Sequence, residues 1–493
     1  MNLTSAMARE LMSMDATDQA ALVKKGRVSS EELIEASSLQ IQEFNPGLNA
    51  VIHPMFEKAK AQIKSVPTDA PFAGVPFLVK DILCHTAGDP YHMGMQFLRR
   101  HDHQEATDTY LAARFRAAGF VFVGKTNTSE LGLQVVTEPL AYGSTRNPWH
   151  LGYTPLGSSG GSAAAVASGM TAVAHGTDGG GSIRLPAAAC GLFGLKPTRG
   201  RVSLGPGIGE VVGGVAVEHV LTRSVRDSAA VLDATAGRVP GDPYAAAPPA
   251  RPFVSEVGTD PGRLRIGVLG RLPNGPDLNP ECLSAVHSTA TFLSSLGHDV
   301  EESWPEALAD VEVGDDFMVL WCVIAAASLE GLSRATGAKI CEDDVEPATW
   351  ALASRGSDFP ATALVNARER LSANGRRQAA WWNRFDVLLT PVMPQLPPRI
   401  GELTPSRDAP LVNFARQLTI ATYTMPFNAT GQPAISVPSG ISASGLPIGV
   451  QLVADQYRED TLLRLGSQLE AARPWPTGII NHAPRGVSVK EAG

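Results

Sequence analysis

One stretch rich in glycine and serine constrains the local fold of this chain more than any other part of the sequence. It runs from Gly157 to Ala187 as GSSGGSAAAVASGMTAVAHGTDGGGSIRLPA and holds eight glycines, five serines and no lysine. Successive glycines allow a backbone to turn several N–H groups toward one point. We therefore expect glycine-rich turns around one or more serine hydroxyls, and we weigh three interpretations of their purpose.

A phosphate cradle is the first interpretation, and the sequence disfavours it. A P-loop requires the pattern GxxxxGK[ST], and a dinucleotide-binding fingerprint requires GxGxxG directly after a strand. No lysine follows these glycines, and the preceding residues NPWHLGYTPL (147–156) are typical of a loop. Nucleotide binding by this stretch is therefore not expected.

A nucleophile elbow of the α/β-hydrolase type is the second interpretation. The pattern GxSxG matches from Gly157 to Gly161, with Ser159 at its centre. Such an elbow requires a strand before the serine, and acidic and histidine partners farther along the chain. The strand is missing from the sequence pattern, and no downstream histidine lies in an informative context. This match is therefore also disfavoured.

The third interpretation is an oxyanion hole that ends on a nucleophile. Asp178 is followed by three glycines and then by Ser182, which places several N–H groups beside one hydroxyl. Each such donor contributes a few kcal/mol of transition-state stabilisation. A serine nucleophile also needs a base. Lys80 ends the apolar run in GVPFLVKDIL (74–83), and burial would lower its pKa from ~10.4 toward neutrality.

Composition restricts the class of function. The 493 residues carry a net charge of −8, so no basic face for general nucleic-acid binding is implied. The chain has five cysteines and no CxxC pair. This spacing predicts reduced thiols in the cytoplasm and no structural zinc site.

No membrane association is expected either. The first residues, MNLTSAMARELMSMD, lack the basic and apolar regions of a signal peptide. The longest strongly apolar run, FMVLWCVIAAASL (317–329), is shorter than the ~20 residues that span a bilayer. We expect a buried helix there, with Trp321 and Cys322 in the core or against the substrate.

Helical and strand patterns alternate along the chain, which predicts an α/β architecture. Helices are expected within 15–45 and at about 103–119, 281–296, 317–335, 361–384 and 460–473. Strands are expected at 74–83, 120–127 and 263–270, and later in the segments DVLLTPV, PAISVP and IGVQLVA.

Several ordered motifs give the chain a family resemblance. They are GVPFLVKD (74–81), GKTNTSELG (124–132), STRNPWH (144–150), the serine–glycine stretch with its continuation to GLKPTRGRVS, and TMPFNATGQPAISVPSGISASGLPIGVQLVA (424–454). Over about residues 15–475 the chain resembles the amidase signature family of serine hydrolases. The resemblance implies one large α/β domain, with a central mixed twisted sheet between layers of helices. The signature core would span about 74–205, the variable pocket region about 206–420 and the C-terminal core segment about 421–478.

The resemblance also implies a Ser–cis-Ser–Lys triad. On this chain Lys80 would be the base, Ser158 the bridging serine that follows a cis peptide bond, and Ser182 the nucleophile. Their spacing agrees with the family pattern, since Ser182 lies 24 positions after Ser158. The GxSxG match on Ser159 would then miss the reacting serine by one residue. Neither a metal nor an organic cofactor is implied.

The same resemblance assigns supporting roles. The N–H groups of Gly179, Gly180, Gly181 and Ser182 would hold the oxyanion. We expect Ser159 to be a structural hydrogen-bonding group, Asp178 to hold the oxyanion loop through backbone N–H groups, and Arg184 to be a buried partner of carbonyls or of an acid. His175 and Cys190 are expected to be packed in the core.

The substrate expected from this pattern is a small, largely apolar amide: an aryl or alkyl amide, a cyclic amide or a carbamate. Leu185 follows SIR where glutaminase subunits of amidotransferases usually have glutamine, and no charged motif for a glutamine α-carboxylate is apparent. A glutaminase-type subunit and a catalytically inactive binding protein are the alternatives. A small-molecule amide is the expected partner, and a homodimer is left open.

Overall fold

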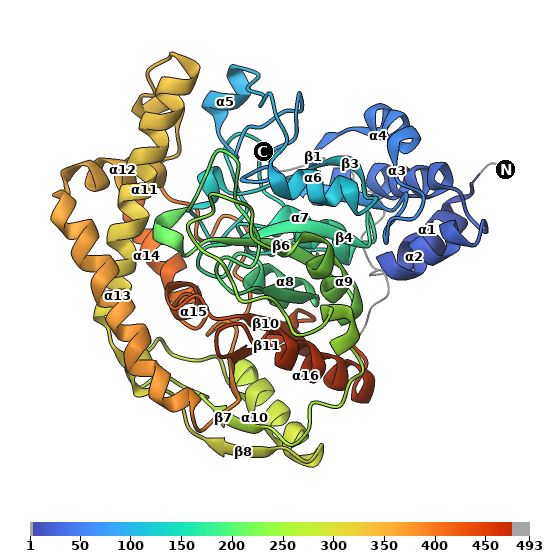
Figure 1. Cartoon of the computed structure of the whole chain (residues 1–493). Coiled ribbons are helices and arrows are strands. Elements are labelled where there is room, and N and C mark those ends of the chain that lie inside the picture. Colours follow the sequence, from blue (N-terminus) through green and yellow to red (C-terminus); the bar gives the residue numbers. More distant parts are fainter. Residues whose placement is uncertain (1–2, 476–493) are drawn as a thin grey trace.

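An eleven-stranded mixed sheet organises residues 3–475, the part of the chain that this computed structural model describes (Figure 1). The strands lie in the order β1-β3-β2-β4-β6-β5-β10-β11-β9-β7-β8. Pairing is parallel between β2 and its neighbours β3 and β4, and between β7 and its neighbours β8 and β9, and antiparallel elsewhere. The predicted fold, one α/β domain with a central mixed sheet covered by helices, is confirmed. The predicted C-terminal segment, 421–478, extends slightly beyond the described residues.

The strands are short, and most are buried along their whole length. Their bounds are β1 Val51–Pro54, β2 Pro76–Lys80, β3 Val121–Thr126, β4 Val173–Asp178, β5 Phe193–Lys196, β6 Val217–Thr222, β7 Arg265–Val268, β8 Asp299–Glu302, β9 Val387–Pro391, β10 Ala434–Ile441 and β11 Pro447–Ala454. A sheet covered on both faces favours continuous apolar runs over alternation, as in the PFLVK sequence of β2.

Helices cover both faces of the sheet. One layer contains α3 (Ser30–Leu48), α7 (Gly160–Ala167) and α8 (Arg184–Cys190). The opposite layer contains α6 (Tyr110–Ala117), α9 (Val225–Thr235), α10 (Pro280–Ser295) and α16 (Glu459–Ala472). Shorter or peripheral helices are α1 Ser5–Ser13, α2 Ala16–Lys24, α4 Phe56–Gln62, α5 Gln96–Arg100 and α15 Pro426–Ala429.

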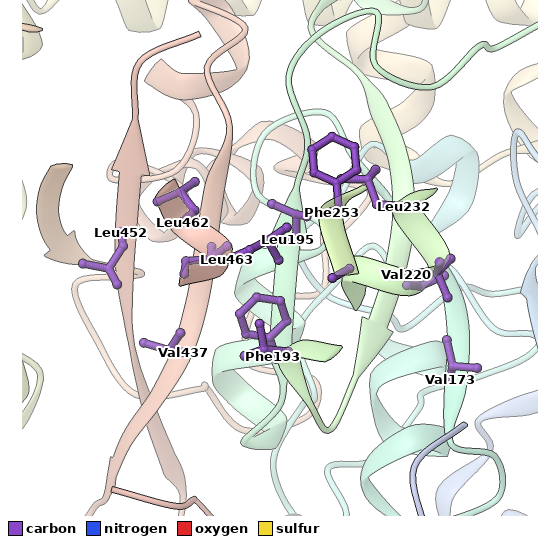
Figure 2. Packing of buried hydrophobic residues seen from close by; sticks show 14 of the residues in the cluster. Val173, Phe193, Leu195, Val220, Leu232, Phe253, Val437, Leu452, Leu462 and Leu463 are labelled. Atoms are coloured by element: carbon purple, nitrogen blue, oxygen red, sulfur yellow. The ribbon is translucent and has the colours of Figure 1, made fainter. Parts of the chain in front are cut away.

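The largest hydrophobic cluster lies between the sheet and the second of these layers. Side chains from β5, β6 and β10 meet leucines of α9 and α16 there, as Figure 2 shows for Phe193, Val220, Val437, Leu232 and Leu462. All five are at most 2% exposed. This packing fixes the central strands that carry the candidate site.

A further group of helices packs beside the sheet (Figure 1). It consists of α11 (Glu312–Thr336), α12 (Pro347–Asp358), α13 (Ala361–Trp382) and α14 (Pro410–Ile420). Among the described residues α11 is the single helix long and apolar enough to cross a membrane by length and composition. Here it packs against α12 and α13, and Phe317, Leu320 and Trp321 belong to a buried cluster, as expected for this run.

Candidate active site

Lys80 is the last residue of β2, and its side chain is completely buried. Its Nζ lies 2.7 Å from Ser158 Oγ, 2.9 Å from Ser159 Oγ and 2.7 Å from Thr177 Oγ1. A neutral amine offers two N–H donors and one lone pair. Ser159 Oγ donates to the Thr177 carbonyl at 3.2 Å, so it accepts from Lys80, and either of the other two hydroxyls can donate to the lone pair. The geometry therefore suits an uncharged lysine.

The electrostatic surroundings favour the same state. Burial lowers the pKa of Lys80 well below its ordinary value, while the charges of Asp178 and Glu218 oppose that shift. Burial dominates because removing an ammonium group from water is costly, and within residues 3–475 no carboxylate contacts Nζ directly. Lys80 therefore loses its proton more readily than an ordinary lysine.

Ser158 lies in the loop before α7, and the Gly157–Ser158 peptide bond is cis. Thr137 fixes this loop, because its hydroxyl contacts the Leu156 carbonyl at 2.9 Å and accepts from the Gly160 N–H at 3.1 Å. A Cβ at Gly160 would lie 2.5 Å from Thr137 Oγ1. The φ of Gly160 lies outside the left-handed region, so its backbone conformation does not require glycine. The close approach of Thr137 does, because any side chain would collide with it.

Ser182 lies between the end of β4 and the start of α8, and its side chain is 8% exposed. The backbone before it depends on Gly181, whose φ is +139°, a value that side-chain-bearing residues rarely adopt. The Gly181 N–H donates to Asp178 Oδ1 at 2.8 Å. This contact removes Gly181 from the expected oxyanion donors. Within residues 3–475 the N–H groups of Gly179, Gly180 and Ser182 have no backbone or side-chain acceptor.

Asp178 and Arg184 form a buried ion pair beneath this loop. Arg184 Nε and Nη2 each donate to the carboxylate at 2.9 Å, and both side chains are inaccessible to solvent. Asp178 also accepts from the Ile183 N–H at 3.2 Å. Burial alone would raise the pKa of Asp178, but the charge and hydrogen bonds of Arg184 lower it to about 2. These are the structural contacts that the sequence predicted for the two residues.

The C-terminal segment completes this network with residues that sequence reasoning missed. Arg184 Nη1 donates to Gln451 Oε1 at 2.7 Å and to the Thr424 carbonyl at 2.8 Å, and Nη2 donates to Asn428 Oδ1. Asn428 Nδ2 returns a hydrogen bond to the Asp178 carbonyl at 2.9 Å. All three residues lie in the motif from residue 424 to 454, so the sequence could have marked them as candidates. A motif alone does not show that its residues contact Arg184.

A cavity of about 410 Å³ opens above the serines. Ser158, Thr177, Gly179 and Ser182 line it, together with apolar side chains from α11, the turn at 208–216 and the loops at 82–93 and 131–133. Glu210 is its one charged lining residue among those described. Trp321 contributes to the wall, and its Nε1 donates to the Leu133 carbonyl at 3.0 Å. The cavity thus suits an uncharged, largely apolar molecule.

Two further residues considered from the sequence lie elsewhere. His175 and Cys190 are buried, and neither lines the cavity. Burial lowers the pKa of His175 well below its usual value, so the imidazole is neutral, and burial raises the pKa of the Cys190 thiol. Both were expected to be packed side chains.

Comparison with known proteins relates this geometry to one family. The Amidase family model matches residues 32–463. A 6-aminohexanoate-cyclic-dimer hydrolase from Pseudomonas sp. (strain NK87) is 43% identical over 470 residues, which cover 94% of this chain and 95% of the relative. The structure of a 6-aminohexanoate cyclic dimer hydrolase complexed with substrate superposes with a TM-score of 0.91 at 42% identity, covering 94% of this chain and 98% of the other. A bacterial aryl acylamidase superposes with a TM-score of 0.87 at 26% identity, with coverages of 96% and 99%.

Proposed function

Because this chain belongs to the amidase family and hydrolyses carbon–nitrogen amide bonds, we propose that it does so through an acyl-enzyme on Ser182, with Lys80 as the base and Ser158 as the bridge. One observation carries the proposal. The buried Lys80 Nζ lies 2.7 Å from Ser158 Oγ at the base of a cavity that Ser182 also lines. A nucleophile requires such an adjacent base.

The proposed first half-reaction moves protons along this line of groups. Lys80 takes a proton from Ser158 Oγ, which takes the proton of Ser182 Oγ as that oxygen bonds to the amide carbon. The N–H groups of Gly179, Gly180 and Ser182 hold the oxyanion. The C–N bond then breaks, the Ser158 hydroxyl protonates the departing amine, and the Lys80 ammonium restores the proton to Ser158.

The second half-reaction repeats the relay with water. Water attacks the Ser182 ester and gives a proton to Lys80 through Ser158. Collapse of the second tetrahedral intermediate breaks the ester bond, and Ser182 Oγ recovers its proton along the same path. The acid is released with no net change in the enzyme.

A cyclic amide of an aliphatic amino acid is the substrate we propose. A cavity of about 410 Å³ is large enough for such a ring, and its walls are largely apolar. The 43% identity with a hydrolase named for a cyclic dimer supports this class, and the aryl acylamidase makes aryl amides the second candidate. Free glutamine fits poorly, since no lysine or arginine lines the cavity to bind its α-carboxylate among the described residues. Hydrolysis of cyclic, aryl, alkyl and carbamate amides by the wild type and Ser182→Ala tests this proposal and separates an enzyme from an inactive binding protein.

We also propose a cytoplasmic location, which the thiols support. All five cysteines are free and four of them are buried, as a reducing compartment allows. The homodimer stays a prediction, and light scattering coupled to size-exclusion chromatography would test it.

The proposed base sets a pH dependence. Burial holds the pKa of Lys80 well below its ordinary value, and only the neutral amine can accept the Ser158 proton. Lowering the pH through this pKa protonates Lys80, so kcat/KM is expected to fall about tenfold per pH unit on the acid side. Rates measured between pH 5 and 10, with folding checked by circular dichroism at each pH, provide the measurement. A rate that stays flat down to pH 5 would exclude Lys80 as the base.

Because α11 forms part of the cavity wall, a large side chain introduced on its cavity-facing side should raise KM, and one introduced elsewhere on the helix should not. Ala327 lines the cavity, so Ala327→Trp is expected to raise KM for the proposed cyclic amides about tenfold or more by filling space that the substrate needs. Glu330→Trp, on an exposed position of the same helix outside the cavity lining, is the matched control and should leave KM unchanged. Equal KM values for both variants would place substrate binding elsewhere.

A further inference from the structure

A second pair of buried ionisable groups lies behind Lys80, outside the lining of the catalytic cavity. Glu218 on β6 and His175 on β4 are both at most 2% exposed, and Glu218 Oε1 lies 3.1 Å from His175 Nε2. Glu218 is the direct cross-strand partner of Thr177. Thr177 Oγ1 in turn lies 2.7 Å from Lys80 Nζ. The sheet thus places a buried carboxyl group next to the residue that contacts the base.

This carboxyl group differs from the other acid near Lys80. Asp178 is neutralised by Arg184 through two hydrogen bonds, whereas Glu218 has no arginine or lysine ion pair among the described residues. Neither Glu218 Oε1 nor the ring nitrogens of His175 have a well-oriented hydrogen bond within residues 3–475. A buried polar group with unused bonding capacity is costly and calls for a reason.

The charges of Glu218 and Lys80 influence each other. Burial raises the pKa of Glu218, and the positive charge of Lys80 opposes this rise. In the same way the negative charge of Glu218 opposes the lowering of the Lys80 pKa by burial. The carboxylate is therefore most stable when Lys80 carries a proton, which is the state that the proposed reaction creates.

We propose that Glu218 is a positioning residue for the amidase reaction: its carboxylate stabilises the ammonium that Lys80 becomes on taking the Ser158 proton, and His175, whose Nε2 lies 3.1 Å from Oε1, limits the positions that this carboxylate can take. This inference rests on the proposed function, since it requires Lys80 to be the base. Glu218 touches no substrate and acts through Lys80. His175 acts through Glu218.

The other ionisable groups around the pair do not replace this carboxylate. Burial raises the pKa values of Cys84 and Tyr91, which keeps both neutral. His85 and Lys125 can add positive charge but no negative charge. Burial lowers the pKa of His219 to about 3, so this imidazole is neutral too. Among the described residues, the ionisable groups whose charges interact with those of Lys80, Glu218 or His175 are Cys84, His85, Tyr91, Lys125, Asp178 and His219, in addition to the three themselves.

The test is the pH dependence of Ser182 labelling by a fluorophosphonate, normalised to folded protein, in wild type, Glu218→Gln, His175→Gln and the double variant. Removing the carboxylate makes the Lys80 ammonium easier to deprotonate, so Glu218→Gln should move the acid limb about one pH unit lower and slow labelling on the plateau. His175→Gln should also shift the acid limb of the pH profile. The double variant should have the same acid limb as Glu218→Gln, because His175 acts only through Glu218. Glu218→Asp, which keeps a carboxylate, should retain a limb close to that of the wild type.

Several outcomes would overturn the inference. One is a Glu218→Gln limb that coincides with the wild-type limb, and another is a double-variant shift equal to the sum of the two single shifts. If Glu218→Gln does not fold, the other two variants decide. The proposal is rejected if the acid limb of the pH profile is unchanged in His175→Gln, or if it moves by a full pH unit in Glu218→Asp. Ser182→Ala distinguishes a failure of the proposed function from a failure of the proposed role of Glu218. Labelling of that variant would refute the proposed function, whereas an inert Ser182→Ala with unmoved limbs refutes only the role of Glu218.

Discussion

Replacing Ser182 by alanine is expected to lower kcat/KM for amide hydrolysis by about 10⁴- to 10⁶-fold while the fold is retained. The acyl-enzyme cannot form without the hydroxyl, and loss of a nucleophile that acts as one unit with its base has an effect of this size. Within residues 3–475 the Ser182 hydroxyl makes no hydrogen bond that the substitution would break. Steady-state kinetics with a cyclic amide and thermal unfolding of both proteins provide the measurement.

A second serine of the same glycine-rich stretch supplies the matched control. Ser168 lies after α7, and within the described part of the chain its hydroxyl bonds only to helix carbonyls, Ala164 O at 2.7 Å and Ala165 O at 3.2 Å. Ser168→Ala should therefore keep kcat/KM within about twofold of the wild-type value, since surrounding helix bonds persist. Near-normal activity in Ser182→Ala would show that the nucleophile lies elsewhere.

Replacing Arg184 by methionine is expected to lower the free energy of unfolding by about 3–5 kcal/mol, because it leaves the buried carboxylate of Asp178 without its partner. The substitution also removes the hydrogen bonds to Asn428, Gln451 and the Thr424 carbonyl. Since Asp178 fixes the Gly181 and Ile183 N–H groups beside Ser182, kcat should fall as well. Urea unfolding and kcat at low denaturant concentration measure the two effects.

An exposed arginine–aspartate pair is the control for this substitution. Arg263 and Asp299 form an ion pair with side chains 72% and 51% exposed, and Arg263→Met should change the free energy of unfolding far less than Arg184→Met, because solvent-exposed pairs contribute little to stability. An unfolding free energy for Arg184→Met that equals that of Arg263→Met would contradict a structural role for the buried network.

Part of the candidate site could be predicted from local sequence. Lys80 ends an apolar run and becomes the buried end of β2, and the DGGGS pattern becomes the turn that presents Ser182. The orientation of the Gly181 N–H could not be predicted from local sequence. This N–H bonds to Asp178 three residues earlier, and that orientation depends on Arg184 holding the carboxylate.

Contacts between distant segments explain what sequence reasoning missed. No sequence motif marks Thr177 as part of the site. The pairing of β4 with β2 and β6 places it between Lys80 and Glu218. Asn428 reaches Asp178 over 250 residues of chain. Local patterns carry no information about which strands become neighbours in a mixed sheet, so these partners require the structure.

The fold itself was predictable where the patterns were long. Helices expected at 281–296, 317–335 and 361–384 correspond to α10, α11 and α13, and the strand expected at 120–127 corresponds to β3. The short edge strands β1 and β8 were missed, because four residues at the edge of a sheet give no clear periodicity. Tertiary pairing with β3 and β7 stabilises them instead. The central strands β4, β5 and β6 were missed as well, since no strand was expected between residues 127 and 263.

The most direct test of the central claim is to trap the acyl-enzyme. Enzyme mixed with a cyclic amide of an aliphatic amino acid is quenched in acid within milliseconds and analysed by intact-protein and peptide mass spectrometry. Opening a ring leaves the amine on the acyl group, so the account predicts a mass gain equal to the whole substrate, located on Ser182 and absent from Ser182→Ala. An adduct on another residue, or one that persists in Ser182→Ala, would contradict the account.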